Sequence, residues 1–146
     1  MKKATLCLVF TLLVFSLFAY TDFLGLWPFI RIHQADEILK SKFFIPEDDS
    51  ETRAIYFGIW DELPLKVELL LSDYGELVLW LYHYETKDFD TLRDEMYNYL
   101  VSFHQKQGDY RFSSEKRTFI SLKDDLGIYL YGDLQNNLVV EYGEDF

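Results

Sequence analysis

Tyrosine and tryptophan side chains are the most distinctive candidates for chemistry in this sequence. Aromatic rings with polar tips offer a large contact area at a small cost in side-chain entropy. We predict that one exposed sheet face binds a ligand or a partner through Tyr56, Trp60, Trp80, Tyr82, Tyr129 and Tyr131. The alternative is that Phe23, Trp27 and Phe29, which precede the predicted sheet, fold back and cover this face.

Histidine and cysteine residues give no sign of a metal or catalytic site. His33, His83 and His104 have no His or Cys partner at a spacing typical of metal ligands. The single cysteine, Cys7, lies inside the predicted leader, so the mature chain has no thiol for a disulfide, a nucleophile or a metal. We therefore predict no metal, no cofactor and no catalytic residue.

Carboxylates are abundant, but they gather in predicted turns at Glu47-Asp48-Asp49, Asp61-Glu62 and Asp124-Asp125. A hydrolase needs two carboxyl groups that face each other across a cleft, one of them with a raised pKa. Exposed turns rarely provide that environment. A carboxylate-based hydrolase is thus the second alternative, and the sequence favours a protein that is not an enzyme.

The first 19 residues have the pattern of a bacterial signal peptide. Lys2 and Lys3 form a charged start, Ala4 to Phe18 is apolar, and Ala19 is a small residue before a cleavage point. We predict cleavage there and a periplasmic or secreted protein. Leu17 is bulkier than the small residue usual at its position, so an uncleaved membrane anchor is the alternative.

The overall charge is strongly acidic, with a formal net charge of −11 for 146 residues. Without the two leader lysines, Lys plus Arg falls from 14 to 12 while Asp plus Glu stays at 25, which gives 12 − 25 = −13. Such a surface repels nucleic acid and anionic lipid. We predict a protein partner, no nucleic acid, and membrane contact only through an uncleaved leader.

A hairpin over residues 65–84 is the predicted centre of the fold. Gly75 ends a three-residue turn, where a positive φ is usual. The register that pairs Ser72 with Glu76 places Leu69 opposite Leu79 on an aliphatic face. The same register sets Trp80 opposite Glu68 and Tyr82 opposite Lys66, on the other face.

The remaining elements are predicted from hydrophobic spacing and turn residues. Before the central hairpin we expect a short helix from Ile32 that ends near Lys42, an acidic loop at 46–51 and a strand at 53–60. After it we expect a helix from Asp88 or Asp90 to about Gln107, with a stop at Gly108. A second hairpin at 117–131, which opposes Leu122 with Leu130 and Asp124 with Ile128, and a last strand at 138–142 complete the sheet. The chain then divides into a leader (1–19), an apolar N-terminal segment with a short helix and acidic loop (20–50), and one α+β domain (51–146).

The sequence therefore predicts an α+β fold with an antiparallel sheet of about six strands. The predicted order is short helix-β-β-β-α-β-β-β, with the long helix packed on the aliphatic face. The function that this sequence favours is that of an exported bacterial domain that binds a macromolecule, such as an inhibitor or an immunity-type protein. The first alternative is a binder of glycans or small apolar ligands that uses the aromatic face.

Overall fold

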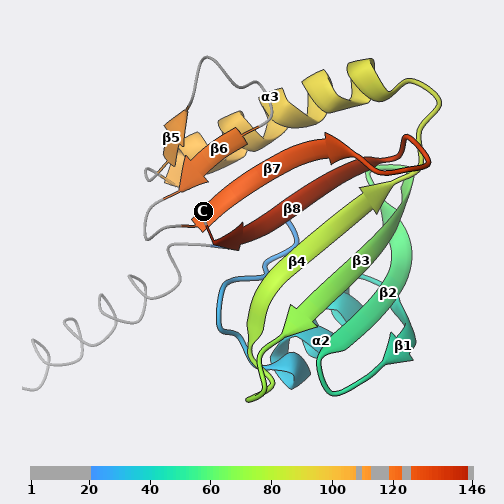
Figure 1. Ribbon diagram of the computed structural model, residues 1–146, viewed down its shortest axis with the longest axis vertical. Helices are drawn as coiled ribbons and strands as arrows, with labels where there is room; N and C mark the ends of the chain where they lie inside the picture. The colour runs from blue at the N-terminus through green and yellow to red at the C-terminus, as the bar shows by residue number, and fades with distance from the viewer. Residues whose placement is uncertain (1–20, 108–109, 113–118, 123–125, 145–146) are drawn as a thin grey trace, which may run out of the picture.

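The computed structural model describes residues 21–107, 110–112, 119–122 and 126–144, and it has the predicted α+β architecture. The elements follow one another as two groups of four strands, each preceded by a helix (Figure 1). Their bounds are α2 Ile32–Ser41, β1 Ile45–Asp49, β2 Arg53–Trp60, β3 Leu63–Leu71, β4 Leu77–Tyr84, α3 Phe89–Gln107, β5 Tyr110–Phe112, β6 Phe119–Leu122, β7 Leu126–Gly132 and β8 Leu138–Glu144.

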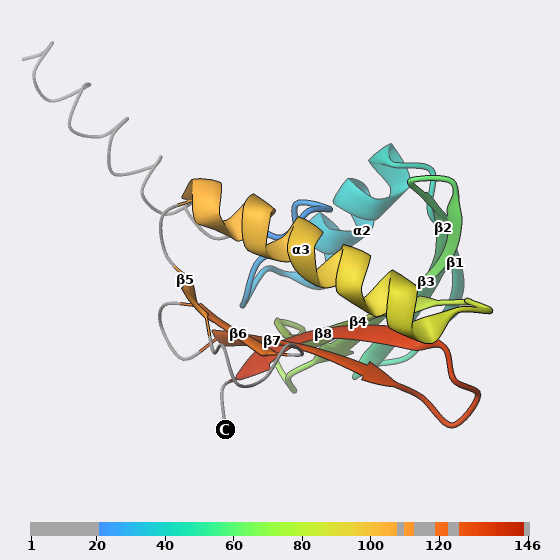
Figure 2. The same ribbon diagram turned by 90° about the horizontal axis from the view of Figure 1, so that it is seen from above.

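All strands belong to one antiparallel sheet with the order β1-β2-β3-β4-β8-β7-β6-β5. The second group of strands is therefore added to the first in reverse order, and β4 pairs with β8 at the centre. Both helices and the segment before α2 lie on the same side of the sheet, and the opposite face carries no helix among the described residues (Figure 2). The sheet therefore has an inner face, which the helices cover, and an outer face on the opposite side.

The central hairpin has the predicted turn but not the predicted register beyond it. Gly75 has a φ of 70°, and the Ser72 amide donates to the Glu76 carbonyl at 2.8 Å. Leu71 pairs with Leu77 as predicted, but the next pair is Leu70 with Leu79, so Val78 is an extra residue in a β-bulge. Every later residue of β4 is thereby moved to the other face of the sheet.

The bulge changes the composition of the covered face. Trp80 pairs with Leu69 and Tyr82 with Val67, so aromatic residues of β4 lie beside aliphatic residues of β3 on the inner side. The predicted separation into one aliphatic and one aromatic face is therefore wrong for this hairpin. A bulge leaves little signal in a run as uniformly apolar as Leu77 to Tyr84, where either alternate set of side chains is hydrophobic enough to be buried.

The second hairpin keeps the predicted facing with a different pairing. Ile120 pairs with Ile128, and Ser121 with Gly127, instead of the predicted opposition of Leu122 with Leu130. The shift is by an even number of residues, so Ile128 and Leu130 still face the core and Tyr129 and Tyr131 still lie on the opposite side. Asp124, which we expected opposite Ile128, is outside the described residues.

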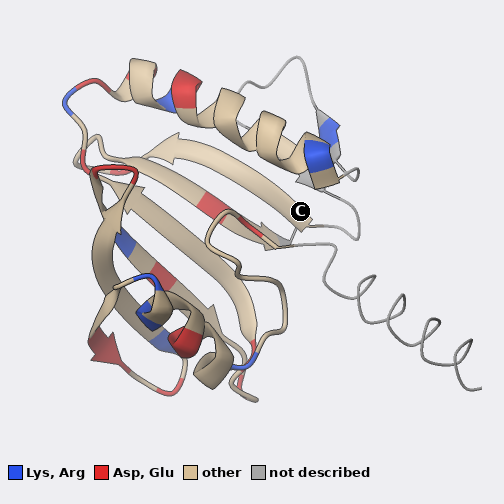
Figure 3. Cartoon of the chain, turned by 180° about the vertical axis from the view of Figure 1, so that it is seen from behind, with Lys and Arg blue, Asp and Glu red and all other residues tan. Residues whose placement is uncertain are grey.

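The acidic segment expected as a loop forms an edge strand instead. Residues 45–49 pair with β2 as strand β1, although every side chain of β1 is exposed. The pairing is made by the backbone, so the side-chain pattern alone did not indicate it. The acids of β1 and Pro46 suit an edge strand, because charge and proline discourage further strand pairing (Figure 3).

The segment before α2 is part of the core and not a separate extension. Phe23, Leu24, Leu26 and Ile30 are all buried and join the same hydrophobic cluster as the inner residues of the sheet. Burial of each such side chain contributes about 1.5–3 kcal/mol. The segment therefore stabilises the fold directly.

The long helix begins and ends close to the predicted residues. The Asp88 carboxylate accepts the Thr91 amide at 3.2 Å, which identifies Asp88 as the capping residue of α3. The inner surface of α3 buries Tyr97, Leu100 and His104, and the helix extends to Gln107. Gly108, the predicted stop, lies outside the described residues.

The predicted leader at 1–19 also lies outside the described residues, so cleavage and export remain predictions. Within the part of the chain that the structure describes, no helix has both the length and the apolar character that crossing a membrane requires.

Candidate binding site

The six aromatic residues predicted as a binding face do not come together on one exposed surface. Three of them are buried in the core, with exposed fractions of 4% for Tyr56, 1% for Trp80 and 0% for Tyr82. The β4 bulge turned Trp80 and Tyr82 to the inner side. Tyr129 and Tyr131 lie on the outer face, and Trp60 is half-buried at the end of β2.

The cover over the buried rings comes partly from the segment that the alternative prediction named. The ring centroid of Phe23 is 4.7 Å from that of Tyr82 and 5.8 Å from that of Trp60. Trp27 is half-buried against the core, whereas Phe29 is 63% exposed and covers nothing. Two of the three named residues thus pack on the sheet.

Asp22 joins the segment before α2 to the sheet through hydrogen bonds. Its carboxylate is buried and accepts the indole N–H of Trp80 at 2.7 Å and the hydroxyl of Tyr82. It also accepts the backbone amides of Leu24 at 2.9 Å and Leu26 at 2.8 Å. With four donors around one carboxylate, the group is fully satisfied from within the chain.

The Asp22 cluster is a closed structural network, not an accessible site. Burial raises the pKa of Asp22 to about 6, although the hydrogen bonds from Tyr82, Leu26, Trp80 and Leu24 act in the opposite direction. The neighbouring His104 is also buried, shares a 2.9 Å hydrogen bond with Tyr142, and has a pKa lowered by burial to about 4. The cavity beside the cluster measures about 10 Å³, about the volume of a single water probe.

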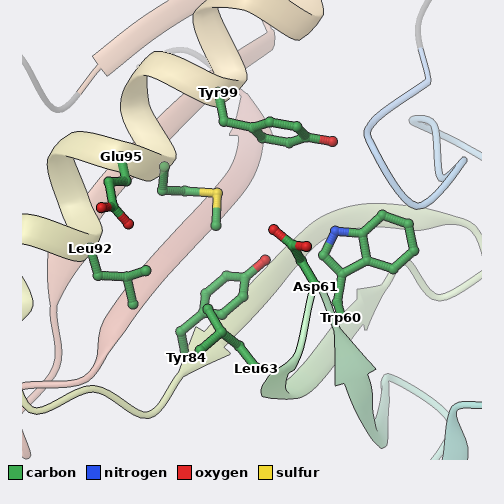
Figure 4. Close-up of a pocket in the computed structure, with 8 residues that line it drawn as sticks. Trp60, Asp61, Leu63, Tyr84, Leu92, Glu95 and Tyr99 are labelled. Carbon is green, nitrogen blue, oxygen red and sulfur yellow. The ribbon is translucent and has the colours of Figure 1, made fainter.

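An open pocket lies between α3 and the β2–β3 turn (Figure 4). Its volume is about 460 Å³, within the usual range of about 300–1,000 Å³ for ligand sites. Aromatic, aliphatic and acidic side chains line it, and they are Trp60, Asp61, Leu63, Tyr84, Leu92, Glu95, Met96 and Tyr99. Figure 4 shows Glu95 on the helix side of the pocket and Asp61 on the turn side.

The β2–β3 turn holds the acidic side of the pocket in a fixed conformation. Trp60 pairs with Leu63, so Asp61 and Glu62 are the only residues of the loop, with φ values of 49° and 66°. A two-residue hairpin loop of this kind needs a positive φ at both positions, and only glycine adopts it without a cost. The pairing of the strands on both sides keeps the turn in place.

Two tyrosines bring hydroxyl groups to the same pocket. Tyr84 is fully buried, its hydroxyl has no hydrogen-bond partner among the described residues, and it points toward Asp61 in Figure 4. Tyr99 is 44% exposed on α3. Burial is the main cause that raises the pKa of both tyrosines, and the negative charge of Asp61 adds to it in each case.

Neither acid of the pocket is neutralised by a residue that the structure describes. Among the described residues, no Lys or Arg side chain lies within ion-pair distance of Asp61 or Glu95, and both acids are exposed. By contrast, Glu68 on the outer sheet face lies 2.8 Å from Arg53 and 3.9 Å from Lys66. The pocket therefore combines aromatic walls with uncompensated negative charge.

Sequence reasoning missed this pocket, although α3 carried a signal for it. Leu92, Glu95, Met96 and Tyr99 lie at spacings of three, four and seven residues, so they share one helix face. An acid inside an apolar stripe is unusual for a helix that only packs on a sheet. What the spacing could not indicate was that the β2–β3 turn lies opposite this face.

The outer sheet face is the other surface on which two predicted residues lie. The hydroxyl of Tyr131 donates to Glu141 at 2.6 Å, and His83 Nε2 lies 3.3 Å from the Glu68 carboxylate. Burial is the main cause that lowers the pKa of His83, followed by the charge of Lys66. A hollow of about 340 Å³ is found nearby, and Lys66, which lines it, lies 3.9 Å from the Glu68 carboxylate.

Metal ligands do not cluster in the described part of the chain, where no group of three or more His, Cys, Asp or Glu side chains could hold an ion. Comparisons with known proteins found no matching family model, no similar curated protein and no similar solved structure. The function is therefore argued from the geometry of the chain itself.

Proposed function

We propose that the protein is an exported bacterial binding domain, without enzymatic activity, that docks a protein partner at the pocket between α3 and the β2–β3 turn. The observation that carries this proposal is the open, aromatic-walled pocket of about 460 Å³ in which two carboxylates have no cationic partner from the described chain. By contrast, the Glu68 carboxylate on the outer sheet face lies 2.8 Å from Arg53 and 3.9 Å from Lys66.

Protein partners are favoured over nucleic acid or membranes by the charge of the chain. A formal net charge of −11 attracts basic surfaces and repels phosphate groups. The half-buried Trp60 and the exposed Tyr99 are of the residue types that dominate the energy of protein interfaces. The predicted export places the encounter in the periplasm or outside the cell.

The proposal is tested by affinity capture that compares two exposed tyrosines. The full chain with its own leader and a C-terminal tag is expressed in its bacterial host as wild type, Tyr99→Ala and Tyr131→Ala, and retained proteins are identified by mass spectrometry. Tyr99 and Tyr131 have similar exposed fractions, 44% and 39%, but only Tyr99 lines the pocket. We expect one protein to be retained by wild type and Tyr131→Ala and lost from Tyr99→Ala.

The reverse pattern would move the binding site to the outer sheet face and overturn the proposal. A circular dichroism melt of each variant confirms that loss of the partner does not reflect loss of the fold. Retention of the same protein by all three forms would also exclude the pocket as the docking site.

A glycan is the second candidate ligand, because carboxylates beside aromatic rings also suit sugar hydroxyl groups. In this case binding would require the rings of Trp60 and Tyr99 and would persist in Asp61→Asn and Glu95→Gln, because the amide oxygens still accept hydrogen bonds from hydroxyl groups. A carboxylate-based hydrolase is the third candidate, since Asp61 and Glu95 line one pocket. Hydrolysis of an oligosaccharide by wild type but not by Glu95→Gln would favour it over a binding function.

A further inference from the structure

We infer that the pocket between α3 and the β2–β3 turn is a cation site that takes the basic side chain of a lysine or arginine on the partner. This inference rests on the proposed function and names its ligand chemistry. The geometry that points to it is the meeting of Asp61 and Glu95, which have no ion-pair partner among the described residues, with the aromatic rings of Trp60, Tyr84 and Tyr99 around one opening (Figure 4).

The aromatic wall already attracts a cation from the chain itself. Lys42 Nζ lies 5.7 Å from the centroid of the Trp60 ring, which is within the distance of a cation–π interaction. Tryptophan has the most favourable ring for this interaction, and a partly desolvated position strengthens it. The indole of Trp60 therefore lies in surroundings that accept positive charge.

Asp61 and Glu95 supply the full negative charge that the aromatic rings lack. Asp61 and Glu95 approach the pocket from different elements, the turn and the helix, so a ligand between them would meet a carboxylate on both sides. Arg93, beside Leu92 on α3, pairs with Asp90 and Asp94, and Lys42 lies near the ring of Trp60. Lys42 contacts the ring, and it forms no ion pair with either acid.

Tyr84 adds a second, independent observation that points to a ligand. Its hydroxyl is buried and has no partner within the described residues, and leaving such a group unpaired is unfavourable. It points toward the Asp61 carboxylate in Figure 4. An ammonium or guanidinium group carries only hydrogen-bond donors, so bound in the pocket it would give this hydroxyl oxygen a partner.

The pocket, with a volume of about 460 Å³, has room for one long side chain and its charged end. The apolar stem would lie along Leu63, Leu92 and Met96, while the ammonium or guanidinium group would reach the acids. A glycan would make less use of this apolar floor. An uncharged apolar ligand would leave the two carboxylates without a role.

The test uses small probes in place of the partner. Nα-acetyl-lysine methylamide and Nα-acetyl-arginine methylamide are titrated into the purified full-length chain, with the neutral Nα-acetyl-norleucine methylamide and methyl glucoside as comparisons. Binding is followed by NMR through the indole N–H of Trp60, assigned with the Trp60→Phe variant. We expect the two cations to shift this resonance, with an affinity that weakens as salt rises, and the two neutral probes to leave it unchanged.

Variants in which one acid is neutralised test whether the carboxylates bind the cation. Asp61→Asn and Glu95→Gln should each weaken the binding of the lysine probe by about 1.4- to 5-fold, as for partly exposed ion pairs. Asp61→Asn should fold, because asparagine tolerates the positive φ of this turn. Asp73→Asn, which removes the same charge from an exposed turn outside the pocket, is the matched control and should leave the affinity unchanged.

The outcomes separate this inference from the proposed function. If the norleucine or glucoside probe shifts Trp60 as strongly as the cations, or if Asp73→Asn weakens binding as much as Asp61→Asn, the cation site is overturned. If the cations fail to bind but Tyr99→Ala still loses the partner, the inference fails and the binding function stands. If the cations bind but Tyr99→Ala retains the partner, the cation site stands and the proposed docking function fails.

Discussion

Asp22 and Asp61 are two carboxylates in tyrosine-rich surroundings, yet the chain uses them in opposite ways. Asp22 is buried and receives four hydrogen bonds, two of them from Trp80 and Tyr82. Asp61 is exposed at a pocket in which the Tyr84 hydroxyl has no partner among the described residues. A satisfied buried network holds elements together, whereas an unsatisfied open one leaves capacity for a ligand.

The difference arises from what lies over each carboxylate. The segment 21–30 turns back over the sheet and closes the space around Asp22, which leaves a cavity of only about 10 Å³. No described segment covers the pocket at Asp61, whose volume is about 460 Å³. Aromatic residues near an acid therefore do not identify a binding site by themselves.

The largest expected effect on stability comes from removal of the buried Asp22 carboxylate. Asp22→Ala removes the acceptor of four buried donors, and each donor left unsatisfied costs at least about 1 kcal/mol, so we expect the free energy of unfolding to fall by about 4 kcal/mol or more. Urea denaturation measures it. Asp61→Asn, the open-side control, should change stability by less than about 0.5 kcal/mol. Equal effects of the two substitutions would contradict the distinction.

The pH dependence of stability should follow from Asp22. Its pKa is raised from 3.8 in the unfolded chain to about 6 in the fold, so the protonated form is favoured by folding. The stability that this provides is complete below pH 3.8 and is lost as pH rises through about 6, a change of about 3 kcal/mol. We expect the unfolding free energy of wild type minus that of Asp22→Asn to fall by this amount between pH 4 and 7.5.

The unfolding free energy of Asp22→Asn is subtracted from that of wild type because His104 also titrates in this pH range. Its pKa is lowered to about 4, so its own contribution runs in the opposite direction and is lost as pH falls from 6.5 toward 4. Both proteins contain His104, and its effect largely cancels in the difference. A difference that stays constant over this pH range would show that Asp22 does not titrate as its burial predicts.

Removal of one hydroxyl from each region should give effects of different sign. Tyr82→Phe breaks a buried hydrogen bond to Asp22 and should destabilise the fold by about 1.5–3 kcal/mol. Tyr84→Phe removes a buried hydroxyl without a partner among the described residues and should be neutral or stabilise the fold by up to about 1 kcal/mol. Urea denaturation of both variants measures the contrast. A Tyr84→Phe variant as unstable as Tyr82→Phe would mean that the Tyr84 hydroxyl has a partner.

The smallest expected effect is at the turn that holds Asp61. Glu62 has a φ of 66°, and Glu62→Gly should raise the free energy of unfolding by up to about 1 kcal/mol because glycine relieves this conformation. Thermal denaturation measures the gain. Glu85→Gly, at an exposed loop residue without a positive φ, is the control and should not stabilise. Stabilisation by both variants would argue against strain at Glu62.

The sequence by itself determined the elements whose residues repeat with a clear period. The helix that ends at Gln107, the strand from Arg53 to Trp60 and the turn at Gly75 were all predictable, because each depends on neighbours close in the chain. Together they were enough for the α+β class and for an antiparallel sheet. The facing of Tyr129 and Tyr131 followed in the same way, from alternation along one strand.

The tertiary structure alone decided which face Trp80 and Tyr82 occupy and where the pocket lies. The bulge at Val78 moved Trp80 and Tyr82 into the core, and a uniformly apolar strand gave no preference between the two registers. β1 was fixed by backbone pairing that its exposed side chains do not indicate. The pocket required Asp61 and Glu95 to meet from elements 34 residues apart (95 − 61), and such a meeting depends on how α3 lies over the sheet.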